Sequence, residues 1–171
     1  MNRPEKNEYA PYYDKYISLI ATEAIMPTLE RQAGELRETF EGVGEERGVY
    51  RYAPDKWTTK ESLSHLIDAE RIFGYRLLRI SRGDETPIEG FEQDGYIENS
   101  NADNRTFVDL TGEFESARNG NLYLVRNLTD EASCRMGTAS GSPVSARALA
   151  FMMAGHVEHH LRIFRDKYLA V

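Results

Sequence analysis

Four segments of the chain repeat apolar residues with the period of an α-helix, and this pattern constrains the fold more than any other feature. The segments run over about residues 22–40, 58–82, 106–128 and 145–168. Connectors rich in Gly, Pro, Asn, Asp and Ser separate them, as is typical of turns and loops. Four amphipathic helices joined in this way predict an all-α protein that folds as a four-helix bundle.

Capping signals mark where two of these helices begin. Thr58 and Glu61 have the spacing of a capping box, in which a hydroxyl and a carboxylate bind free backbone N–H groups at a helix start. Thr106 and Asp109 repeat the spacing at the third helix. Residues 9–20 are rich in tyrosine, and they predict a short helix or arm that packs over the bundle.

The connector over residues 83–105 is long for a compact domain. Long connectors in bundles often cross over, so that the two helices they join run parallel. A helix of about 24 residues is about 36 Å long, and about 20 residues of connector can span that distance. The second and third helices can therefore run parallel, and we expect the connector to form part of a pocket wall with Phe91 and Tyr96.

Length and charge argue against several functional classes. The 171 residues predict a single domain over residues 1–171. A net charge of -7 opposes nucleic-acid binding, which needs Lys and Arg to neutralise phosphates. There is no apolar stretch long enough for a membrane span and no apolar signal core at the N-terminus. Together with a single cysteine, Cys134, these features predict a cytoplasmic protein.

The four histidines of the chain lie in only two of the predicted helices. His156 and His160 are one turn apart, about 40° round the helix, within an apolar stripe that faces the core. His159 lies on the flank of that stripe. His65 faces inward on the second helix. Two inward histidines at i and i+4 commonly hold a metal ion, and a third imidazole would complete an open catalytic site if the two helices pack together.

Two further residues share a helix with His65. Asp68, one turn away, is a candidate to orient an imidazole through a hydrogen bond. Arg76 lies on the His65 face three turns further on. A buried arginine needs a partner, which is either a core Asp or Glu or the carboxylate of a substrate.

Three hypotheses follow from the residues. In the first, a metal ion activates a thiol or a water molecule, which attacks an electrophilic small molecule. In the second, the same site stores a metal or binds a small ligand without catalysis, and a fourth protein ligand such as His159 would favour this hypothesis. In the third, the histidines form a core network with tyrosine hydroxyls and bind no metal.

The sequence resembles the DinB family, which includes the YfiT-like metal-dependent hydrolases. The matching segments are KWTTKESLSHLIDAER (residues 56–71), TPIEGFEQDGY (86–96), GHVEHHLRIFRDKY (155–168), RYAPDKW (51–57) and YISLI (16–20). They occur in the right order over nearly the whole chain, and HLID and GHVEHH are the most specific of them.

The resemblance implies a four-helix bundle with up-down-down-up connections. It also implies a divalent metal ion, nickel or zinc, bound by His65, His156 and His160. Some relatives use a low-molecular-weight thiol such as bacillithiol or mycothiol, others are described as hydrolases, and members are commonly homodimers. We therefore expect a thiol-dependent S-transferase or a hydrolase that acts on a small molecule.

Overall fold

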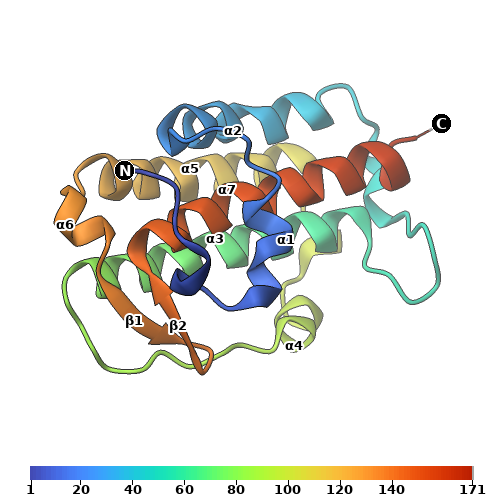
Figure 1. The fold of residues 1–171 in the computed structure, drawn as a ribbon. Helices are drawn as coiled ribbons and strands as arrows, with labels where there is room; N and C mark the ends of the chain where they lie inside the picture. The colour runs from blue at the N-terminus through green and yellow to red at the C-terminus, as the bar shows by residue number, and fades with distance from the viewer. Residues whose placement is uncertain (171) are drawn as a thin grey trace.

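The computed structural model describes residues 1–170 as a bundle of helices (Figure 1). Its four long helices are α2 (Ile25–Phe40), α3 (Thr59–Ser81), α5 (Phe107–Arg126) and α7 (Ala146–Ile163). The colours in Figure 1 show that α2 and α7 run from left to right, whereas α3 and α5 run from right to left. The predicted, mainly helical architecture is confirmed.

The capping signals act where the sequence predicted them. The Thr58 hydroxyl accepts a hydrogen bond from the Glu61 N–H at 3.0 Å, and the Glu61 carboxylate accepts one from the Thr58 N–H at 2.7 Å. Thr106 caps α5 in the same way through the Asp109 N–H at 3.1 Å. The capping box fixes the first turn of α3, and His65 follows it within two turns.

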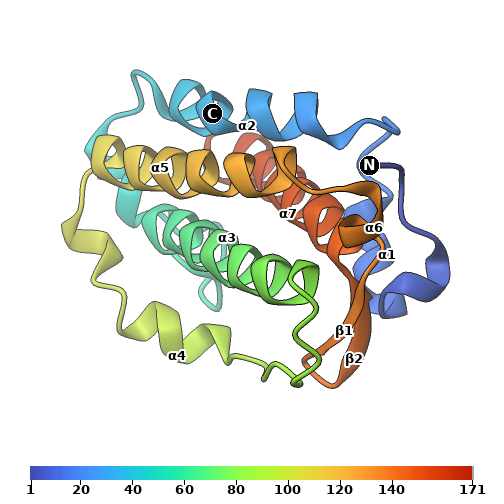
Figure 2. The same ribbon diagram turned by 90° about the vertical axis from the view of Figure 1, so that its left-hand side faces the viewer.

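Shorter elements surround the four helices. The N-terminal arm contains 3₁₀ turns at Lys6–Glu8 and Pro11–Tyr13 and the helix α1 (Asp14–Ile17), which packs on α7. Other short helical pieces are the 3₁₀ turns Glu45–Val49 and Ala102–Asn104, α4 (Gln93–Glu98), α6 (Asp130–Ser133) and a π-helical turn, Phe164–Tyr168, that continues α7. Figure 2 shows the connector that contains α4 running along the length of α3 on the side away from α2.

A β-hairpin is the one departure from an all-α fold in the part of the chain that the structure describes. Its strands, β1 (Met136–Ala139) and β2 (Ser142–Ser145), are antiparallel. Ser140 and Gly141, with φ of 51° and 74°, form the tight turn between them. Ile88 of the long connector also pairs with β1, through two main-chain hydrogen bonds of 2.9 Å. The hairpin therefore holds the connector against the bundle.

The core lies around α7, whose residues from Ala148 to Val157 are all buried. A charged group is buried beside this core as well. Arg118 of α5 is 0% exposed and binds both carboxylate oxygens of Glu70 of α3 at 2.8 Å. It also donates to the side chain of Gln32 of α2 at 3.1 Å. This pair, which the sequence pattern did not predict, joins three of the four long helices.

Within residues 1–170, every helix is too short or too polar to cross a lipid bilayer.

Candidate metal centre

Three histidines converge where α3 packs against α7. One ring nitrogen from each of His65, His156 and His160 lies within 4.8 Å of the other two. The Nε2 atoms of His65 and His156 are 3.1 Å apart. The ring centroids are separated by 4.7 to 5.2 Å. The packing of the two helices thus brings together the three residues that the spacing had placed on inward faces.

Neighbouring aromatic rings enclose this cluster. Gly155 has no side chain, and a Cβ atom there would overlap the main-chain carbonyl of Tyr16. The arm can therefore pack directly on α7, which places the Tyr16 ring edge-on to His156 at 5.2 Å between centroids. Just before α3 begins, Trp57 packs its ring on His65, with 4.8 Å between the ring centroids. Gly155 and Trp57 act at the site through packing, a role that residue type alone did not indicate.

Burial keeps the three imidazoles neutral near pH 7. Their exposed fractions are only 5%, 6% and 8% for His65, His156 and His160. Burial lowers the pKa of His65 to about 4, and the negative charge of Asp94 opposes this change only in part. Burial also lowers the pKa of His156 and of His160 well below the usual value, and the neighbouring histidines add to the effect. The neutral imidazole is the form that binds metal ions.

The donor set and its spacing fit a divalent metal ion. A tetrahedral zinc ion with bonds of about 2.0–2.1 Å holds two imidazole nitrogens about 3.3 Å apart, close to the 3.1 Å between the two Nε2 atoms. Ser62 Oγ lies 3.4 Å from Nδ1 of His160. Donation from Nδ1 to this hydroxyl would leave the lone pair on Nε2 for a metal. The 3.1 Å separation also suits an N–H···N hydrogen bond between neutral rings, as the core-network hypothesis requires.

Two cavities open onto the cluster. The first, of about 340 Å³, is lined by His65, His156 and Arg76, and we call it the His–Arg cavity. Five aromatic side chains complete most of its wall: Tyr12, Tyr13, Tyr16, Phe73 and Phe91.

The second cavity, of about 280 Å³, is lined by His160, Ser62 and Trp57 among others. A larger cavity of about 660 Å³ between α3, α4 and α5 contains none of the three histidines, so size alone does not identify the site.

The structure does not bring Asp68 or Tyr96 to the histidines. Both line the separate cavity of about 660 Å³. Three residues after His65, Asp68 is turned about 60° round the helix, and among residues 1–170 its carboxylate makes no hydrogen bond to an imidazole. The neighbour of His65 from the expected pocket wall is instead Phe91, which lines the His–Arg cavity.

His159 and Arg76 lie close to the cluster but outside it. The half-buried His159 ring packs edge-on against Tyr16 and His160, and it is not part of the three-histidine group. Arg76 is buried in the wall of the His–Arg cavity. The core Asp or Glu considered as its partner is absent among the described residues, because the buried carboxylate of Glu70 is bound to Arg118 instead.

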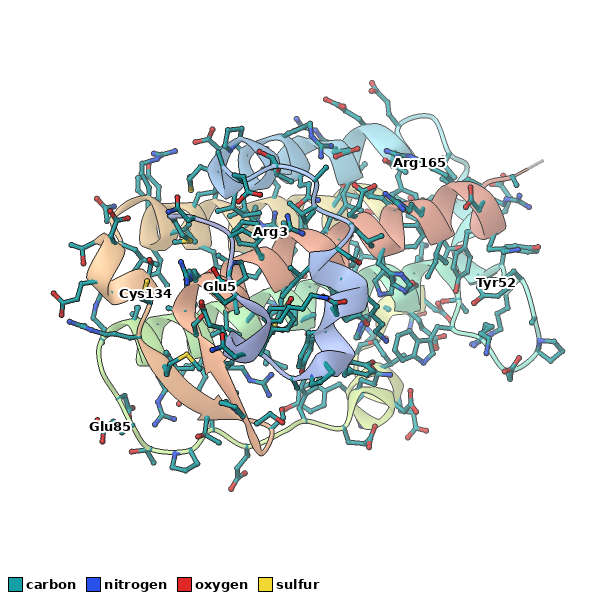
Figure 3. The ribbon with its side chains drawn as sticks, in the orientation of Figure 1. Arg3, Glu5, Tyr52, Glu85, Cys134 and Arg165 are labelled. Carbon is teal, nitrogen blue, oxygen red and sulfur yellow. The ribbon has the colours of Figure 1, made fainter. Side chains whose placement is uncertain are left out.

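Cys134 lies away from the site. Its exposed thiol is beside α6, at the opposite end of the molecule from Tyr52, which lines the cavity at His160 (Figure 3). This position leaves the thiol outside the candidate site.

The metal-free protein is expected to lose stability as the pH falls from 6.5 towards 4. The unfolded chain protonates its histidines near pH 6.5, whereas the pKa of buried His65 is about 4. Between these values the unfolded state binds more protons, so each such histidine lowers the free energy of unfolding by about 1.4 kcal/mol per pH unit. Urea unfolding at several pH values measures how steeply the free energy of unfolding changes with pH. An unchanged slope in a His65→Gln variant would contradict the prediction.

The sequence model of the DinB superfamily matches residues 28–164. No curated protein matches. YfiT from Bacillus subtilis, described as a probable metal-dependent hydrolase with an unusual four-helix bundle topology, is similar in structure, with a TM-score of 0.74 and 17% sequence identity. The match covers 93% of this chain and 87% of that one.

A mycothiol-dependent maleylpyruvate isomerase is also similar in structure, with a TM-score of 0.69 and 15% identity. The match covers 91% of this chain but only 63% of the isomerase. A histidine-to-alanine mutant of that isomerase matches with a TM-score of 0.69 and 14% identity. At these identities the likeness shows a shared fold.

Proposed function

The chain belongs to the DinB superfamily, and from this premise we propose that it binds one divalent metal ion through His65, His156 and His160 and uses it to transform a small molecule. The observation that carries the proposal is the convergence of three buried, neutral imidazoles that also line two cavities, His65 and His156 one of them and His160 the other. A core network needs no adjoining cavity, whereas a reactive centre needs access for its substrate. The description of YfiT as a probable metal-dependent hydrolase supports the same function.

The residues of the chain have separate tasks in this function. A bound divalent metal would act as a Lewis acid that lowers the pKa of a thiol or water ligand. His65, His156 and His160 hold it, and the Ser62 hydroxyl can orient the ring of His160. The rings of Tyr16 and Trp57 shield the histidines from bulk water, which strengthens electrostatic interactions inside the site.

A thiol-dependent transfer or a hydrolysis is the proposed type of reaction. In either reaction a bound metal would lower the pKa of the thiol or water molecule so that solvent can accept its proton near pH 7, and neither reaction requires a separate buried base. The His–Arg cavity, of about 340 Å³, has room for a small molecule beside the histidines. The description of one structural relative as mycothiol-dependent supports a low-molecular-weight thiol as co-substrate.

Several finer features belong to the same proposal. Imidazole ligands suit nickel and zinc, and we propose one of these as the metal. The helix directions in Figure 1 support up-down-down-up connections. We also propose a single domain, a homodimer and a cytoplasmic location, with no role for nucleic acid or membranes.

Cobalt substitution tests whether the site accepts a thiol. We expect the Co²⁺-loaded protein to gain a thiolate-to-cobalt absorption band in the near ultraviolet when 2-mercaptoethanol is added, because three protein ligands leave a position free. A His159→Ala variant should show the same band, since its side chain lies outside the cluster. A cobalt spectrum that does not respond to thiol, together with no hydrolysis of an ester and amide panel, would support a non-catalytic metal-binding module.

A further inference from the structure

Arg76 carries a buried charge without a countercharge. It is 3% exposed, and its Nη2 donates to the main-chain oxygen of Glu89 at 3.0 Å and to the hydroxyl of Ser140 at 2.9 Å. Both acceptors are neutral. Its Nε–H is buried and has no acceptor at all. An arginine stays protonated in proteins, and burial of an unpaired charge is costly. This side chain is therefore expected to have an anionic partner, which the described chain does not supply.

Most other arginines near this face of α3 have such a partner. Arg79, one turn further along α3, binds the carboxylate of Asp84 at 2.6 Å. Arg118 binds Glu70. Two acidic residues lie beside Arg76: Glu89, whose main-chain oxygen accepts from it, and Glu92 in the cavity wall. The side chains of both are exposed, and neither carboxylate is within 4 Å of the guanidinium. The partner of Arg76 is therefore to be sought outside the described chain.

The His–Arg cavity has room for such an anionic partner. Residues of α3 at successive turns line it: His65, Ala69, Phe73 and Arg76. The α-helical rise puts about 16 Å between the first and last of these Cα atoms. The cavity thus follows α3 from the histidine cluster to Arg76, and the wall between them is apolar and aromatic. A molecule that fills it meets a possible metal ligand set at one end and a cation at the other.

We propose that Arg76 binds the carboxylate of the small molecule that occupies the His–Arg cavity, so that the ligands of this site are carboxylic acids with an aromatic or apolar body. The proposal rests on the proposed function for the reacting end of the substrate, whereas the carboxylate contact stands on the unpaired guanidinium alone. The carboxylate accepts from the free Nε–H, and it can replace the exposed Ser140 hydroxyl on Nη2 as a charge-assisted, two-point contact.

Fluorine NMR with 4-fluorobenzoate and the neutral 4-fluorobenzamide tests this assignment on the full chain, with and without zinc. The wild type should bind the carboxylate at least about tenfold more tightly than the amide. Arg76→Met should weaken 4-fluorobenzoate binding by at least about tenfold, without a fall in melting temperature, because an unpaired buried charge is removed. Arg79→Met is the matched control and should bind as the wild type does.

The outcomes separate this inference from the proposed function, because zinc content is measured on the same samples. Equal binding by the wild type and Arg76→Met, equal binding of acid and amide, or no saturable binding of 4-fluorobenzoate would overturn the inference, even if zinc is bound. Binding that appears only with zinc and survives Arg76→Met would also overturn it, because the carboxylate would then bind the metal. Arginine-dependent binding in a protein that takes up no zinc would uphold the inference and reject the metal function.

Discussion

Replacement of His160 by alanine is expected to abolish stoichiometric metal binding, whereas replacement of the adjacent His159 leaves it intact. His160 is buried in the three-histidine cluster, and removal of its ring leaves two protein ligands. His159 lies on the same turn of α7 but outside the cluster. Loss of a residue that only orients a metal ligand already costs about 10–100-fold in affinity, so loss of a ligand should cost at least ~100-fold.

Elemental analysis of tag-free protein, reconstituted with zinc and separately with nickel, measures this effect. We expect about one metal ion per chain in the wild type and in His159→Ala, and a small fraction of that in His160→Ala. Circular dichroism of all three proteins verifies that the helices are retained. No metal in the wild type after reconstitution would reject the metal site and leave a core network of imidazoles. About one metal ion per chain in His160→Ala would show that other residues bind the metal.

Replacement of Glu70 by alanine is expected to destabilise the protein by about 3–5 kcal/mol. The change leaves the guanidinium of Arg118, which is 0% exposed, without a countercharge in the core. Asn121 also loses one of its two acceptors, because its Nδ2 donates to Oε1 of Glu70 at 2.8 Å and keeps only the main-chain oxygen of residue 70. An unsatisfied buried charge costs far more than a lost surface contact, so the effect should be among the largest of any single substitution outside the site.

Urea denaturation of Glu70→Ala and of a control, Glu30→Ala, checks this expectation. Glu30 pairs with Arg126 and also joins α2 to α5, but both side chains are about half exposed, so its loss should cost no more than about 1 kcal/mol. The double variant Glu70→Leu/Arg118→Met should recover much of the stability, since it removes both charges. Similar losses for Glu70→Ala and Glu30→Ala would show that the buried pair does not stabilise the bundle.

Local patterns predicted the elements that depend on neighbouring residues. The capping box of Thr58 and Glu61 forms as expected, and α3 and α5 begin at the predicted residues. A helix of this kind is determined by its own apolar stripe and by side chains three or four residues apart. The hairpin of β1 and β2 was not predicted, because its strands have only 4 residues each and are stabilised by their contacts with α3, α7 and the long connector.

The sequence by itself determined which histidines face inward, because the 3.6-residue period sets the direction of each side chain on a helix. The sequence could not determine which charged side chains form ion pairs with each other. Arg76 and Arg118 are both buried on inward faces. The packing of α2, α3 and α5 brings Arg118 into an ion pair with Glu70, whereas Arg76 lines a cavity without such a pair in the described chain. Periodicity is a local property of the sequence. The partner of a buried charge depends instead on which residues distant in sequence the fold brings together, so only the tertiary structure decided the ion pairs.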